Sequence, residues 1–272
     1  MPEFDRSTPV AVALSTHAGT VDIVAEERVS VLAEAHPLDG SDAARNAADN
    51  TLISLEGDTL VVSAPDAAGW SWRRTGKLRI TVRVPLDSSI GVKTASADVR
   101  ATGRFAAARV ETASGDIRVE DVTGDAELQA ASGNVTVGRV GGSLRIHSSS
   151  GDLQVSDVTR DVNADTASGD ITVRSAGGSA RVETASGDIE VGSLRQGEAR
   201  LSSASGDVTV GVLAGTGVWL DVNTASGKTR NELTMTGDAP AADTGAKLEL
   251  RIRTASGDIQ IRRVTSQAPA AA

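Results

Sequence analysis

The hydrophobic and polar positions from residue 92 onward follow a pattern that repeats about every eighteen residues. The segment Thr-Ala-Ser-Gly-Asp-Ile recurs in identical or altered form, starting at Thr94, Thr112, Ala130, Ser148, Thr166, Thr184, Ser203, Thr224 and Thr254. The first six starting points are eighteen residues apart, and the later spacings grow to 19, 21 and 30. A fixed period of this length indicates a repeat architecture in which each unit stacks on the next.

Apolar residues stand at fixed positions on both sides of each Ser-Gly step. Two residues before the Thr position the column reads Val92, Val110, Leu128 and Ile146, and five residues after it Val99, Ile117, Val135 and Leu153. Apolar and polar positions alternate with a period of two, which is typical of strands rather than helices. Each unit therefore predicts two short strands, with bends at Ala-Ser-Gly and at a second glycine such as Gly124 or Gly142.

These units predict an all-β fold, a single-stranded parallel β-solenoid (β-helix) with about 18 residues per coil. Stacking at about 4.8 Å would place each column in a continuous apolar ladder, which one unit alone cannot bury. We expect a right-handed winding, by analogy with parallel crossovers. The regular solenoid of about nine coils is expected at 92–264, with a flexible tail at 265–272.

The first ninety residues read as a degenerate version of the same pattern. The segment from Leu14 to Ile23 overlays on the segment from Val110 to Val119, and further strands are expected at 28–33, 51–55, 59–63 and 78–84. A short helix is expected from Ser41 to Ala48, where Ser and Asp precede an Ala-rich stretch. We expect residues 1–91 to form an N-terminal degenerate β-solenoid cap over a strand edge that would otherwise pair with other chains. The insertion at 232–246 is expected to fold over the last coils.

Composition limits the kind of core, partner and metal site that the chain can have. Aromatic residues are 2% of the chain, so aliphatic side chains must fill a thin core. The net charge of −9 is spread along the chain without a basic stripe, which excludes nucleic acid as a partner class. There is no Cys, which excludes disulfides and thiolate metal sites. The N-terminal residues hold no apolar run of signal-peptide length, and no membrane span is expected, so the expected location is cytoplasmic, or the cell surface if a leader was removed.

The repeat resembles a known family. The Thr-Ala-Ser-Gly-Asp-Ile units, the opening Gly19-Thr20-Val21-Asp22-Ile23, and the closing run from Trp219 to Thr224 are similar to the bacterial putative-adhesin β-solenoid domains of unknown function, common in actinobacteria. The resemblance covers nearly the whole chain. It implies the fold, and it brings no catalytic residues with it.

A column of carboxylates follows the glycine of the repeat. It comprises Asp98, Asp116, Asp152, Asp170, Asp188, Asp207 and Asp258, and Asn134 and Lys228 interrupt it. Stacked carboxylates repel, so Ca²⁺ could compensate, as it does in Gly-rich nonapeptide rolls. The favoured interpretation is structural: each Asp accepts backbone N–H bonds at its bend, as in an Asx-turn. We therefore expect no metal and no cofactor.

One predicted loop differs from the rest of the chain because it combines aromatic and basic side chains. Trp70, Trp72, Arg73 and Arg74 place two indoles beside two guanidinium groups, which could stack on a sugar ring or contact a partner protein. The alternative is that one Trp fills the core of the cap. His17, His36 and His147 lie far apart in the sequence without a nucleophile partner, which disfavours catalysis.

The pattern favours a non-catalytic scaffold or adhesin-like binding module that presents extended sheet faces to a protein or glycan partner. It is not expected to be an enzyme. Two alternatives stay open: a polysaccharide-active β-helix enzyme, which needs convergent carboxylates in a groove, and a calcium-stabilised surface domain. The sequence does not fix the oligomeric state.

Overall fold

The computed structural model describes residues 2–65, 76–233 and 247–265. The chain divides into two compact units: an N-terminal unit of residues 1–142 and 146–150, and a C-terminal unit of residues 143–145 and 151–272. Strands make up nearly all of the regular structure, and the parallel sheets wind as a solenoid, which confirms the predicted fold class. No helix in the described residues has the length and apolar character needed to span a membrane.

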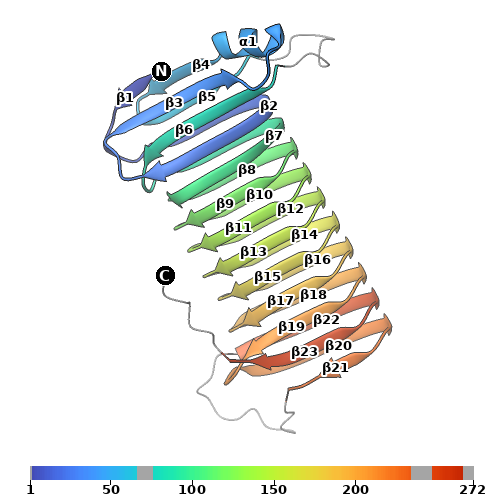
Figure 1. Cartoon of the computed structure of the whole chain (residues 1–272). Coiled ribbons are helices and arrows are strands. Elements are labelled where there is room, and N and C mark those ends of the chain that lie inside the picture. Colours follow the sequence, from blue (N-terminus) through green and yellow to red (C-terminus); the bar gives the residue numbers. More distant parts are fainter. Residues whose placement is uncertain (1, 66–75, 234–246, 266–272) are drawn as a thin grey trace. The chain divides into compact units, whose positions relative to one another are not determined.

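The regular part of the N-terminal unit is built from short strands in two parallel ladders (Figure 1). Its strands are β7 (Ser89–Phe105), β8 (Ala107–Ser114), β9 (Ile117–Val122), β10 (Ala126–Ser132) and β11 (Val135–Val140), and β12 (Leu144–Ser150) has residues in both units. In one ladder Val110 pairs with Leu128, and in the other Ile117 pairs with Val135. Both registers are offset by eighteen residues, so the predicted columns are real rows of paired residues.

The cap of the N-terminal unit begins with a full coil. Strand β2 (Ala11–Glu26) is bent at Gly19 and pairs in parallel with β7 along both of its halves. On its other side, β5 (Thr59–Ser63) and β6 (Leu78–Pro85) pair in parallel with its first and second halves. The boundary expected after residue 91 falls inside β7, so the cap and the regular coils share a strand.

The outer layer of the cap departs from the expected winding. Strands β3 (Ser30–Pro37) and β4 (Leu52–Glu56) run antiparallel to β6 and β5, and β1 (Glu3–Asp5) runs antiparallel to β3. The cap is therefore β-rich as predicted, but only β2, β5 and β6 continue the parallel solenoid. A tight turn at Gly57 explains the pairing of β4 with β5, since neighbouring antiparallel strands need only such a turn, whereas β3 and β6 pair although they lie far apart in the sequence.

The predicted helix is present as α1 (Asp42–Asp49), which lies beside β3 and β6 in the cap (Figure 1). The Ser41 side chain caps it by accepting a hydrogen bond from the Ala44 backbone N–H at 3.1 Å. Ala44 is fully buried, so the Ala-rich face of the helix packs against the cap.

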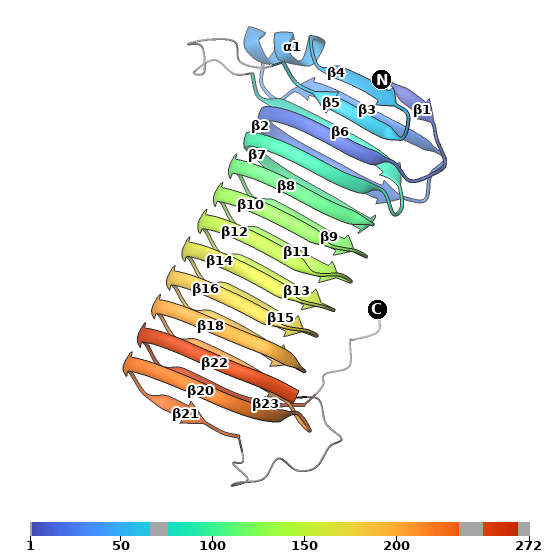
Figure 2. The same ribbon diagram turned by 180° about the vertical axis from the view of Figure 1, so that it is seen from behind.

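The C-terminal unit repeats the two-ladder arrangement (Figure 2). Its strands are β13 (Leu153–Val158), β14 (Val162–Ser168), β15 (Ile171–Ala176), β16 (Ala180–Ser186), β17 (Ile189–Leu194), β18 (Gly197–Ser205), β19 (Val208–Leu213), β20 (Gly217–Ser226), β21 (Thr229–Asn231), β22 (Lys247–Ser256) and β23 (Ile259–Val264). Leu153 pairs with Ile171, and Ile171 with Ile189. These residues are fully buried, so aliphatic rows form the core as predicted.

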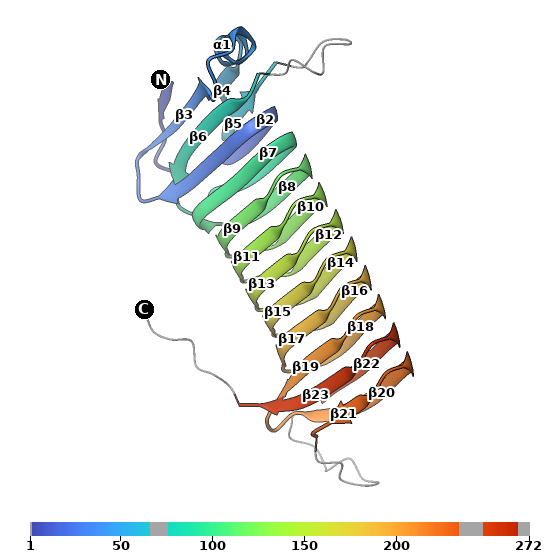
Figure 3. The same cartoon turned by 45° about the vertical axis from the view of Figure 1, so that its right-hand side comes forward.

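The order of the last coils differs from their order in the sequence. Strand β22 pairs with β18 on one side and with β20 on the other, and β23 lies in the same way between β19 and β21. The coil made last in the chain therefore lies between the two coils that precede it, and β20 lies outside β22 in every view (Figures 1–3). Simple sequential stacking, assumed from the repeat, is wrong here. The insertion expected at 232–246 to fold over these coils lies outside the described residues from residue 234 onward, so this expectation stays a prediction.

Candidate functional site

The column of carboxylates is bonded along the C-terminal unit. The Oδ1 atom of each Asp accepts a hydrogen bond from the backbone N–H of the equivalent residue one coil further on: Asp152 from Asp170 at 3.0 Å, Asp170 from Asp188 at 2.8 Å, Asp188 from Asp207 at 2.7 Å, and Asp207 from Asp258 at 2.7 Å. The donor lies in the neighbouring coil and not in the same turn, so this bond is a cross-coil bond rather than an Asx-turn. Each carboxylate is thereby used to hold two coils together.

The same bond joins the coils of the N-terminal unit and ends at a lysine in the C-terminal unit. Asp98 accepts from the Asp116 N–H at 3.0 Å, and Asp116 accepts from the Asn134 N–H at 2.9 Å. Asp258 accepts from the Lys228 N–H at 2.8 Å. The crossed strand order explains why a lysine replaces the Asp at position 228. The β20–β21 coil is outermost among the described coils, so a carboxylate there would find no further backbone N–H from which to accept a hydrogen bond.

The Thr and Ser hydroxyls of the repeat point into the bends and not to solvent. Thr166, Thr184 and Ser203 are buried, and their hydroxyls donate to backbone carbonyls of Ser168, Gly169 and Gly187 at 3.1 to 3.3 Å. Satisfied in this way, the hydroxyl column supports the bends and offers no external row of donors.

A metal-binding grouping is not found in the part of the chain that the structure describes. No three His, Cys, Asp or Glu side chains there lie close enough to hold a metal ion. His36 pairs with Glu34 at 3.1 Å on β3, while His17 lies at the bend of β2. The Arg104 guanidinium lowers the pKa of Asp87, and Arg109 and Lys93 lower the pKa of Glu111, but these are surface ion pairs.

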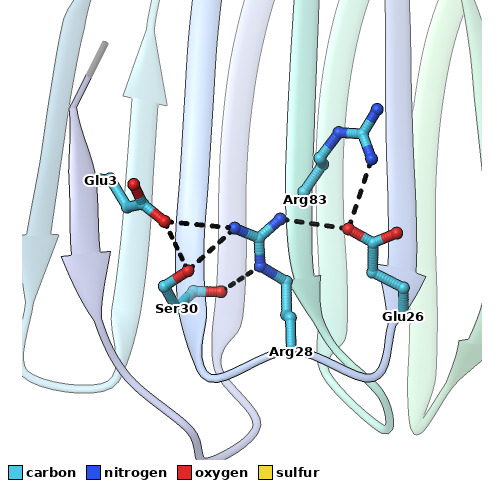
Figure 4. A network of polar contacts seen from close by, with 5 residues as sticks. All are labelled: Glu3, Glu26, Arg28, Ser30 and Arg83. Carbon is cyan, nitrogen blue, oxygen red and sulfur yellow. Dashed lines mark hydrogen bonds and ion pairs between the residues drawn. The ribbon is translucent and has the colours of Figure 1, made fainter.

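A polar network fixes the outer corner of the cap (Figure 4). The Arg28 side chain, only 14% exposed, follows β2 and donates from Nη2 to the Ser30 hydroxyl at 2.9 Å and from Nη1 to Glu26 at 3.2 Å. The Ser30 hydroxyl in turn donates to Glu3 at 2.7 Å, and Arg83 on β6 donates to Glu26 at 3.3 Å. The network joins β1, β2, β3 and β6, so its role is structural.

The outer face of the C-terminal unit carries an exposed indole. Val218, Leu220 and Val222 of β20 align with the buried Leu248, Leu250 and Ile252 of β22, so the residues between them point outward. We define the Trp219 face as the outward residues at the end of these two strands: Trp219, Asp221, Asn223, Glu249, Arg251 and Arg253. Trp219 is 56% exposed, and the Arg251 guanidinium carbon lies 5.7 Å from the centre of its ring.

Every guanidinium group on and beside this face has a carboxylate partner. Arg251 pairs with Glu249, and Arg253 lies 3.7 Å from Asp221. On the neighbouring strands, Arg200 pairs with Glu198 at 2.7 Å and Arg181 with Glu183 at 2.9 Å. The face is therefore rich in charged groups but has little excess of either sign.

The amino-acid sequence predicted a binding site at other residues. Trp70, Trp72, Arg73 and Arg74 lie outside the described residues, so that predicted binding loop stays a prediction. Sequence reasoning missed the Trp219 face, although alternation along 217–226 places Trp219 opposite to the apolar column.

Fold and site together define a class: repeat proteins with an aliphatic solenoid core and outer faces that carry charged, polar and aromatic side chains. Within that class, the family model described as Toastrack DUF4097 matches residues 11–262, and the chain belongs to this family. No curated protein matches the sequence.

Solved structures similar to this chain carry binding-type names. One is a putative adhesin from Bacteroides fragilis, with 13% identity over 97% of this chain and 95% of that one, and a TM-score of 0.47. Another is a putative lipid binding protein from Parabacteroides distasonis, with 15% identity, the same coverage and a TM-score of 0.46. A putative adhesin from the same organism has 10% identity, again the same coverage, and a TM-score of 0.41.

Proposed function

We propose that this protein is a non-catalytic binding module, a repeat scaffold whose outer sheet faces contact a protein or glycan partner. The observation that carries the proposal is that inward, bend and outward side chains have different roles. Inward positions are aliphatic, and the Asp and Thr columns are used in bonds between or within coils. Among the described residues, the outward positions present charged groups and the exposed indole of Trp219, and an aromatic anchor with polar groups around it suits an interaction surface.

The test is capture of a partner by the purified chain. The chain, immobilised through either end, is exposed to extract and to surface material of its source cells, and retained proteins and glycans are identified. Specific retention that survives moderate salt supports the proposal. Retention of nothing beyond what a bead control retains contradicts it.

The predicted loop at 70–74 allows a separate test of where the partner binds. A double variant, Trp70→Ala with Trp72→Ala, is expected to weaken capture if the loop at 70–74 is the contact, as proposed from its indoles and guanidiniums. Unchanged capture by that variant directs attention to the sheet faces.

The two rival functions make different predictions. A polysaccharide-active enzyme would release reducing ends from a glycan panel, and a calcium-stabilised domain would show a large fall in melting temperature on chelation. The cytoplasmic location and the actinobacterial origin stay predictions, and cell fractionation tests the first of them.

A further inference from the structure

Trp219 makes little contribution to the core of the protein. The chain fills its interior with aliphatic side chains, and the buried Phe105 is the kind of aromatic that does pack there. The inward positions of β20 are taken by Val218, Leu220 and Val222, while the Trp219 ring is 56% exposed on the opposite face. An exposed indole leaves a large apolar area in water, which is a common property of binding surfaces.

The indole is held in place before any ligand arrives. The Arg251 guanidinium lies over the ring at 5.7 Å, and Arg251 is itself paired with Glu249 and lies 3.8 Å from Glu198. Trp has only two side-chain torsions, so little conformational entropy is lost when it binds. One face of the ring is therefore supported by protein, and the exposed remainder can accept a flat apolar surface.

Polar groups beside the ring are arranged in rows. Asp221 and Asn223 follow Trp219 on β20 at alternate positions that face outward. Arg253 lies opposite Asn223 in the register of β20 with β22. Outward positions on one strand repeat about every 6.6 Å, so Asp221 lies one step from the indole and the Asn223–Arg253 row lies two steps, about 13 Å, along the strand. This combination suits a ligand with an apolar face and a rim of hydroxyls.

Charge selects among ligands of that kind. Arg251, Arg253 and Arg200 all have carboxylate partners, so an anionic ligand would have to displace Glu249, Asp221 or Glu198. Breaking such pairs leaves a carboxylate near the anion, which is unfavourable. A neutral ligand meets no such obstacle.

We propose that the Trp219 face is a binding site for a neutral glycan of two or more rings, with one sugar ring stacked on the indole and hydroxyls of that ring and the next bonded to Asp221, Asn223 and Arg253. The proposal rests on the proposed function and names the ligand class and the site for it. A single aromatic anchor supports only a modest affinity, with a Kd on the order of micromolar to millimolar.

The experiment measures binding of neutral oligosaccharides to the full chain. Cellotetraose, chitotetraose, laminaritetraose and maltotetraose are titrated by calorimetry and by saturation-transfer NMR, with heparin as an anionic comparison. Trp219→Ala is expected to weaken binding by at least about tenfold, and Trp219→Phe by less, because a ring face is kept. Leu52→Ala, which removes an equally exposed apolar side chain (56%) from the N-terminal unit, is the matched control and should bind as the parent does. Raising salt should change the affinity little, since no net charge is neutralised.

Each outcome decides the question. Binding of a neutral glycan that is lost in Trp219→Ala and kept in Leu52→Ala supports the proposal. Equal binding by Trp219→Ala, or a preference for heparin that falls with salt, overturns it. If no glycan binds while the capture experiment retains a protein, this inference fails and the proposed function stands; if neither binds, both fail. Should Trp219→Ala change the far-ultraviolet circular dichroism, Asn223→Ala replaces it, and unchanged affinity in that exposed-site variant overturns the proposal.

Discussion

At each bend of the coils, the glycine of the Ser-Gly step lies where no side chain fits. Gly169 has φ +129°, and a Cβ atom built on it would lie 2.3 Å from the carbonyl oxygen of Gly151, one coil earlier. Because the contact is with backbone, no side-chain movement can relieve it. The glycine column is thus required by the spacing of the coils and by the backbone conformation together.

Gly169→Ala is therefore expected to lower the free energy of unfolding by about 2–4 kcal/mol. Urea titration followed by circular dichroism measures it. Gly40→Ala is the control, since a Cβ there meets nothing within 4 Å, and it should change stability by less than about 0.5 kcal/mol. Equal effects of the two substitutions would refute the steric argument.

The carboxylate column separates two properties of Asp, its acceptor oxygen and its charge. Asp188 accepts from the Asp207 N–H, and its own N–H donates to Asp170. Asp188→Asn keeps an acceptor and removes like-charge repulsion, so stability should stay equal or rise, whereas Asp188→Ala should cost about 1 kcal/mol. Melting curves measure both. A rise of several degrees in the melting temperature of the parent on adding Ca²⁺ would instead favour the calcium-stabilised alternative.

One surface pair gives a defined pH dependence. Arg104 donates two hydrogen bonds of 2.8 Å to Asp87, and this lowers the pKa of Asp87 below its ordinary value of 3.8. A carboxyl whose pKa is lowered by folding stabilises the native state above its ordinary pKa, and that stability is lost as the pH falls through the folded-state pKa. The parent should therefore lose more stability below pH 4 than Asp87→Asn does, as measured by melting temperature across an acid pH series. Asn tolerates the positive φ of 62° at this position, so the turn is kept. Parallel pH profiles for the two chains would contradict this account.

At the scale of elements, one side chain links β1 and β3 of the cap to β2 in addition to the backbone pairing of the strands. Arg28 bonds to groups on β2 and β3 and reaches Glu3 on β1, which is only three residues long. Arg28→Ala would leave Glu3 without its cation and Glu26 with Arg83 alone, and it should cost about 2 kcal/mol, with faster hydrogen exchange in β1 and β3. Arg45→Ala is the comparison, because its partner Asp42 is fully exposed on α1 and little loss is expected. Unchanged exchange in β1 would show that the network does not secure the cap.

Strands and bends could be predicted because alternation and glycine act locally. The rows such as Val110 with Leu128 followed directly from the eighteen-residue spacing. The antiparallel pairing of β3 with β6 could not, because an alternating segment fits a parallel or an antiparallel neighbour equally well. The position of β22 was equally hidden, since every coil carries the same apolar columns and so fits either neighbour.

For the whole molecule, the repeat predicted the scaffold far better than the site. The Asp column led to a structural interpretation, an Asx-turn at each bend, whereas the carboxylates accept their hydrogen bonds from the neighbouring coil. The indole at 219 went unremarked as a site because a single Trp has no pattern of its own. Alternation along 217–226 places the indole on the outward side, and the register of β20 on β22 then shows which charged residues lie beside it.

The crossed order of the last coils also constrains how the chain is made. During synthesis, β20 and β21 leave the ribosome before the strands on which they rest. They can reach their final neighbours only after the C-terminal strands have entered between them and β18, so the last layers assemble in a different order from their translation. A nascent chain cut short before residue 247 would thus lack an internal layer rather than its outermost one.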